Sequence, residues 1–118
     1  MVALDHAVQA LVGAHPSDLT PDTAIAFVAG QVGAGDNTFT NSSNTMFIAK
    51  NAGAVSRTIT FTSVADPTYH RTGDVVLTLA GVIGDVVMFK FPSTAGWVTA
   101  GKTTFLVSHA DVLVAIVK

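Results

Sequence analysis

The side chains that could carry chemistry in this sequence are few and far apart. The four histidines are His6, His15, His70 and His109, and none belongs to an H-x-H, H-x-x-x-H or H-E-x-x-H pattern. Cysteine and glutamate are absent, so the pool of residues that could bind a metal ion is small. The sequence therefore predicts neither a metal site nor any other cofactor.

A serine, a histidine and an aspartate stand close together near the C-terminus, at Ser108, His109 and Asp111. Adjacent residues of a strand point to opposite faces, so Ser108 and His109 would not converge on one substrate. The G-x-S-x-G motif of many serine hydrolases is absent. The other aspartates fall mostly in turn segments, where capping of the backbone accounts for them. We therefore expect a protein that is not an enzyme.

The composition narrows the class of protein further. The chain has 118 residues, which is the size of one domain, and only 12% of them are charged, against about 25% in a typical soluble domain. A hydrophobic share of 49% excludes a disordered chain. The net charge is −2 without any block of lysine and arginine, so we expect no nucleic-acid partner. We also expect no membrane span and no signal peptide, because long apolar runs and a basic N-terminal stretch are both missing.

Most of the chain has the pattern of β-strands. Valine, threonine and isoleucine, which favour strands, make up 37 of the 118 residues. Apolar and polar residues alternate in 57–62, where Ile59 and Phe61 would face a core. Six further candidate strands are Ala24–Val28, Thr45–Lys50, Val75–Leu79, Val87–Phe91, Thr103–Ser108 and Val112–Val117. We therefore predict an all-β fold, an antiparallel β-sandwich of immunoglobulin-like or jelly-roll type with about seven to eight strands.

The N-terminal segment has a different pattern. Its apolar residues stand at helical spacing, and a glycine and a proline then interrupt them: Leu4, Val8, Leu11, Val12, Gly13 and Pro16. We predict one domain, residues 1–118, in which residues 1–22 form an N-terminal arm or linker. Within this segment we expect a short helix or an arm over Asp5–Val12.

The apolar content exceeds what one small core can use, so we expect partners to cover part of the surface. Val112–Val117 is apolar on both faces, which is typical of a central strand or of a strand at an interface. Trp97, the only tryptophan, suits a core or interface position, or alternatively a platform on which a ligand stacks. The candidate interface residues are Val2, Leu4, Val8, Leu11, Val12, Trp97, Leu113 and Val117.

The order of several motifs resembles that of a known family. A glycine-rich turn leads into Asn37-Thr38-Phe39-Thr40-Asn41, followed by Thr45–Gly53, which ends in Lys50-Asn51-Ala52-Gly53, and by Arg57-Thr58-Ile59-Thr60-Phe61. An aromatic-proline turn, Phe91-Pro92-Ser93, and an apolar strand over Leu113–Val117 come later. This layout, over residues 36–118, is similar to small virion proteins of tailed bacteriophages, and in particular to capsid decoration (head-stabilising) proteins.

The resemblance implies a β-sandwich subunit that binds the outside of an assembled capsid as a homo-oligomer, often a trimer. The implied partners are the major capsid protein and further copies of this chain, and the implied location is the virion surface after synthesis in the host cytoplasm. The resemblance implies no catalytic residues in this chain. Two alternatives stay open. One is another phage component, in the tail, at the head–tail junction or on a fibre. The other is a carbohydrate- or cell-surface-binding β-sandwich that uses Trp97 and Tyr69.

Overall fold

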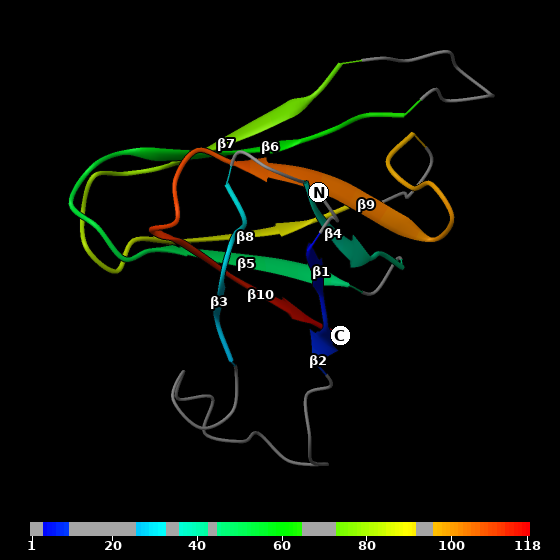
Figure 1. The fold of residues 1–118 in the computed structure, drawn as a ribbon, viewed down its shortest axis with the longest axis horizontal. Coiled ribbons are helices and arrows are strands. Elements are labelled where there is room, and N and C mark those ends of the chain that lie inside the picture. The colour runs from blue at the N-terminus through cyan, green and yellow to red at the C-terminus, as the bar shows by residue number, and fades with distance from the viewer. Residues whose placement is uncertain (1–3, 10–25, 33–35, 43–44, 65–72, 92–95) are drawn as a thin grey trace.

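The computed structural model describes residues 4–9, 26–32, 36–42, 45–64, 73–91 and 96–118, which form ten strands and no helix (Figure 1). The prediction of an all-β protein is therefore confirmed. The strands are β1 (Leu4–His6), β2 (Val8–Gln9), β3 (Val28–Ala29), β4 (Asn37–Thr40), β5 (Met46–Asn51), β6 (Arg57–Phe61), β7 (Val75–Leu79), β8 (Val86–Lys90), β9 (Lys102–Val107) and β10 (Val112–Val117). One sheet has the order β1-β4-β9-β6-β7, and the other has the order β2-β10-β5-β8 with β3 paired to β10.

The described strands pair in a mixed pattern. Six of the eight pairs are antiparallel, and two short pairs, β1 with β4 and β2 with β10, are parallel. Both parallel pairs are made by one N-terminal segment. It forms β1 at the edge of the first sheet, leaves that sheet at Ala7 and forms β2 at the edge of the second (Figure 1). The predicted sandwich was purely antiparallel with about seven to eight strands. The described residues instead form ten strands, two pairs of which are parallel.

Residues 4–9, the described part of the N-terminal segment, are strand and not helix. Leu4, His6 and Val8 are more buried than the two residues between them, as expected for a strand with one inward face. Leu4 and Val8 are four residues apart, a spacing that places both on one face of a helix and also on one face of a strand. The apolar spacing alone therefore does not distinguish a helix from a strand. Of the two alternatives predicted for Asp5–Val12, a short helix or an arm, the helix is wrong as far as position 9. Positions 10 to 12 lie outside the described part of the chain.

Six predicted strands occur within one or two residues of their expected bounds, namely β5 to β10. The strand predicted at Ala24–Val28 is reduced to β3, since Ala26 and Phe27 are not extended in a sheet and positions 24 and 25 are not described. β4 is not among the strands that the sequence predicts, because its four residues directly follow a glycine-rich turn and include two threonines and an asparagine. Asn37 is fully buried and paired with Phe105 of β9.

The core lies between the two sheets and is rich in phenylalanine. Phe47 of β5 stands at its centre, with ring centroids 4.9 Å from Phe61 on β6 and 5.0 Å from Phe105 on β9. Both contacts are edge-to-face, the geometry that aromatic pairs prefer. Ile59 and Phe61 are fully buried, as their alternation predicted. The interdigitated rings join the two sheets into one packed unit.

The C-terminal strand β10 is central, which is one of the two positions that its apolar composition favoured. It pairs with β5 on one side and with β2 and β3 on the other. Val112, Val114 and Ile116 face the main core, and Ala115 and Val117 form a second cluster with Ile48 on the outer face of the sheet. The ring of Phe27 packs against this second cluster, and the Lys50 ammonium lies 4.6 Å from its centroid. The outer face is therefore partly covered from within the chain.

Candidate functional site

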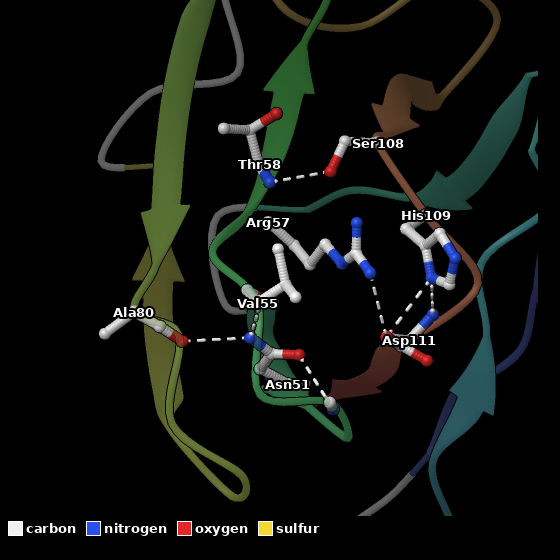
Figure 2. Close-up of polar contacts among 9 residues, drawn as sticks. Asn51, Val55, Arg57, Thr58, Ala80, Ser108, His109 and Asp111 are labelled. Carbon is white, nitrogen blue, oxygen red and sulfur yellow. Dashed lines mark hydrogen bonds and ion pairs between the residues drawn. The ribbon is translucent and has the colours of Figure 1, made fainter.

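A cluster of polar side chains gathers around Asp111, in the turn between β9 and β10 (Figure 2). Oδ2 of Asp111 is 3.2 Å from Nη2 of Arg57 on β6 and 3.3 Å from Nδ1 of His109. Nδ1 of His109 also accepts a hydrogen bond of 3.0 Å from the backbone N–H of Asp111. Gly53 lies directly against the carboxylate, since a Cβ atom there would collide with Oδ2. The ion pair therefore joins β6 to the turn that begins β10.

The side chains of Ser108 and His109 have different partners. The hydroxyl of Ser108 accepts the backbone N–H of Thr58 at 2.9 Å, and Figure 2 shows it turned toward β6. The lone pair of His109 Nδ1 is already engaged by the backbone of Asp111. β9 ends at Val107, so Ser108 and His109 lie in the bend that follows it, and their separate bonds rather than strand alternation keep the two side chains apart. These residues therefore hold together the corner of the fold where β6 meets the turn between β9 and β10.

Asn51 forms a second corner beside the first. Its side chain is fully buried, and Nδ2 donates to the backbone oxygens of Val55 at 2.8 Å and Ala80 at 2.9 Å. Its Oδ1 accepts the N–H of Gly53 at 3.0 Å. The backbone N–H of Asn51 donates to the oxygen of Asp85 at 2.9 Å. Asn51 thus connects the end of β5 to both ends of the β7–β8 turn, and Figure 2 shows its bond to Ala80 at the first of these ends.

His6 is buried at the place where the N-terminal segment crosses between the sheets. Its Nε2 lies 3.0 Å from Oδ1 of Asn37, and its ring packs 5.3 Å from that of Phe105. Oδ1 of Asn37 also accepts the N–H of Gln31, so the buried amide is an acceptor and Nε2 of His6 is the donor. His15 and His70 lie outside the described residues. The described histidines therefore act as hydrogen-bonding groups of the fold.

Two hollows flank the same crossing. One has a volume of about 200 Å³ and a mostly apolar wall that includes Val28, Val114 and Ile116. The other has a volume of about 340 Å³ and a more polar wall that includes His6 and Lys118. The first is smaller than most ligand pockets and the second is at the lower end of their range. In the more polar hollow, Asp5 is bonded to Lys102 of β9 at 2.6 Å, which lowers the pKa of its carboxyl below the ordinary value.

The residues predicted to form an interface are mostly part of the packing. Val8 and Trp97 pack against the main core, and the ring of Trp97 lies 5.3 Å from that of Phe91. Leu4 and Leu113 are half-buried, and Val117 is only 4% exposed. The remaining three, Val2, Leu11 and Val12, lie outside the described residues, as does Tyr69. In the described part of this set, little apolar area is left for a partner.

Five of the nine large exposed apolar side chains among the described residues lie elsewhere, on the segment from β7 through its turn to β8; the other four are Val28, Val32, Val55 and Leu106. Ile83 is 70% exposed and Met88 is 65% exposed. The others in this segment are Val76, Val82 and Val86. We call residues 75–90 the β7–β8 segment. The sequence contained a signal for it, because Val82 and Ile83 stand in a turn, and because Val86 and Met88 alternate with the inward Val87 and Phe89.

The turn of the β7–β8 segment has a defined backbone. The N–H of Asp85 donates to the oxygen of Val82 at 3.1 Å, and Gly84 has a φ of 87°. Only glycine adopts this φ without strain, so the turn depends on Gly84. The carboxylate of Asp85 accepts the N–H of Ala80 at 2.9 Å. These bonds present Val82 and Ile83 at the tip of the turn.

A scan against protein-family models, a search of curated proteins and a search of solved structures each found no match. Within the described ranges, no helix is long and apolar enough to cross a membrane. The same ranges hold no group of three or more His, Cys, Asp or Glu side chains that could bind a metal ion. The fold defines an all-β protein of two mixed sheets, and five of its large exposed apolar side chains lie along the β7–β8 segment.

Proposed function

We propose that the chain is a structural, non-enzymatic virion protein that binds the outside of a bacteriophage capsid as an oligomer. Two features support the proposal: the resemblance of residues 36–118 to capsid decoration proteins, and the exposure of the β7–β8 segment. The exposure of the β7–β8 segment carries the proposal, because several large apolar side chains exposed along one segment favour a contact with a partner. The partners are the major capsid protein and further copies of this chain, a trimer in the arrangement that the resemblance implies.

In this role the protein stabilises the head by binding the assembled shell in preference to its separated subunits. Binding that favours one state stabilises that state by mass action. Many copies add their contributions over the lattice and oppose the internal pressure of the packaged DNA. The aromatic core and the Asn51 corner favour such a role, since they hold the turn of the β7–β8 segment on a packed two-sheet body.

An immunoglobulin-like or jelly-roll sandwich is the finer fold assignment that goes with this proposal. Antiparallel pairs predominate among the described strands, and phenylalanines of both sheets share one core. Both features are typical of sandwiches. The N-terminal segment, which pairs with an edge of each sheet, would then close one side of the sandwich.

Co-sedimentation with expanded capsids that lack the protein, from the phage whose genome encodes it, tests the proposal. We expect saturable binding by the wild-type protein, and capsids without it should release DNA at a lower temperature. Ile83→Asp places a charge at the exposed turn tip and should weaken binding on the order of tenfold or more, because buried unpaired charges are costly. Val32→Asp is the matched control, since Val32 is exposed outside the β7–β8 segment.

Failure of the wild-type protein to bind these shells would contradict the proposal. Cryo-EM of the virion would then show whether the protein occupies the tail, the head–tail junction or a fibre instead. Equal binding by Ile83→Asp and the wild type, with binding lost in Val32→Asp, would place the contact on another face.

A further inference from the structure

Among the described strands, β8 is the edge strand of its sheet. It pairs with β5 over Val86–Lys90, and no described strand pairs with its other side. The backbone oxygen of Asp85 points to β5, where it accepts the N–H of Asn51. Backbone groups of successive strand residues point to alternate sides. The N–H and C=O groups of Val86, Met88 and Lys90 therefore point away from β5, along the free edge.

The same three residues also present their side chains to solvent. Met88 is 65% exposed and Val86 is 49% exposed, and both lie on the outer face of the sheet beside Ile48 and Lys50 of β5. Proteins commonly protect an edge strand with proline, with a bulge or with several charges. Within 86–90 there is no proline, the pairing with β5 is continuous, and the only charge is Lys90. The edge is thus suited to accept another strand.

We propose that two copies of the chain associate through this edge, with their β8 strands antiparallel about a two-fold axis at Met88. In this register Met88 lies opposite Met88 of the second copy, and Val86 lies opposite Lys90 of the second copy. All three residues that point outward then form hydrogen-bonded pairs, because an edge in this register is complementary to itself. The β2-β10-β5-β8 sheet continues from one copy into the other.

The charges of the strand favour a second copy in this orientation. Asp85 stands just before β8 and Lys90 at its end. Antiparallel pairing brings Lys90 of each copy next to the Asp85–Val86 end of the other, while the two lysines stay at opposite ends. A parallel arrangement would instead place like charges side by side, which is unfavourable across a strand pair.

This inference does not depend on the virion role. The two-fold contact through β8 is a different association from the trimer that the resemblance implies on the capsid, and it is the one we expect for the free protein in solution. A protein that fails to bind capsids could still pair through β8, and a protein that binds capsids could fail to do so. The two proposals are therefore tested separately.

The absence of cysteine from the chain allows a sharp test. In the proposed register the two Met88 Cα atoms are about 5.5 Å apart, which a disulfide can span. The two Val86 Cα atoms are about 14 Å apart, four residues along the strand, which a disulfide cannot span. Met88→Cys should therefore give a covalent dimer on mild oxidation, and Val86→Cys should not. Equal cross-linking of both variants, or of neither, would overturn the register.

Sedimentation velocity tests the association itself. We expect a concentration-dependent dimer for the wild type and at least a tenfold higher dissociation constant for Met88→Lys, which places two ammonium groups opposite each other. Val76→Lys on β7 is the matched control, with a similarly exposed residue on the edge strand of the other sheet, and should dimerise like the wild type. A wild-type protein that is monomeric at about 0.1 mM would overturn the proposal.

Discussion

Replacement of Asn51 by alanine removes three hydrogen bonds from one buried side chain. The bonds lost are those to the oxygens of Val55 and Ala80 and from the N–H of Gly53, with lengths of 2.8, 2.9 and 3.0 Å. A buried hydrogen bond contributes about 1 kcal/mol net, so the three together predict a loss of about 3 kcal/mol in the free energy of unfolding. That is a large part of the stability of a small domain.

Urea unfolding followed by the fluorescence of Trp97, the only tryptophan, measures this loss. Ser56→Ala is the matched control, because its hydroxyl makes a single bond of 3.0 Å, to the oxygen of Leu79 in the same region. It should cost about 1 kcal/mol, with the denaturant slope unchanged in both variants.

Hydrogen exchange locates the effect in the structure. In Asn51→Ala, the N–H groups of Gly53 and Asp85 should exchange faster than in the wild type, because the turns they belong to lose their anchor. The amides of β9, away from this corner, should change only through the global stability. An Asn51→Ala variant that loses no more stability than Ser56→Ala would refute the reasoning, since one buried side chain would then not be holding both turns.

Three other substitutions test the packing and the electrostatics. Phe47→Ala empties the centre of the core and should lower the free energy of unfolding by about 3–5 kcal/mol, measured by urea unfolding; a loss below about 1 kcal/mol would show that Phe47 is not central. Gly30→Ala places a Cβ atom 2.6 Å from Cγ2 of Val107 and should cost about 1–3 kcal/mol, and unchanged thermal stability would contradict the close approach. Asp5→Asn removes the negative charge that pairs with Lys102. The lowered pKa of Asp5 means that this contribution is present at neutral pH and is lost as the pH falls through the folded-state pKa. The difference from the wild type should therefore be below about 1 kcal/mol at pH 7, since the pair is exposed, and should vanish in acid; a difference that grows in acid would refute it.

Local pattern was sufficient to predict most of the strands. The alternation in Arg57–Phe61 and the uninterrupted apolar run in Val112–Val117 each correspond to a strand at those positions. A strand buries one face when every second residue is apolar, and this period is visible in sequence without knowledge of partners. The turn between β7 and β8 was equally visible, because Gly84 and Asp85 have the backbone preferences that such a turn requires.

The candidate sites depended on contacts between distant residues. Arg57 and Asp111 are 54 positions apart, and His6 and Asn37 are 31 positions apart. No spacing rule connects such pairs, so the ion pair and the buried histidine were not predicted. Ser108 and His109 were expected to diverge as neighbours in a strand, but they lie beyond the end of β9, and their bonds to Thr58 and Asp111 account for their different directions.

The sequence by itself determined that this chain forms strands, where most of them begin and end, and that its apolar residues exceed one core. Only the tertiary structure decided which apolar residues remain at the surface. Val117 and Met88 are both outward on their strands, yet Val117 is buried and Met88 is exposed. The reason is what surrounds each position: Phe27 and Met46 pack against the cluster that contains Val117 on the central strand β10, while Met88 lies on the edge strand β8. Strand order is set by pairing between distant segments, which the two-residue period of a single strand does not encode.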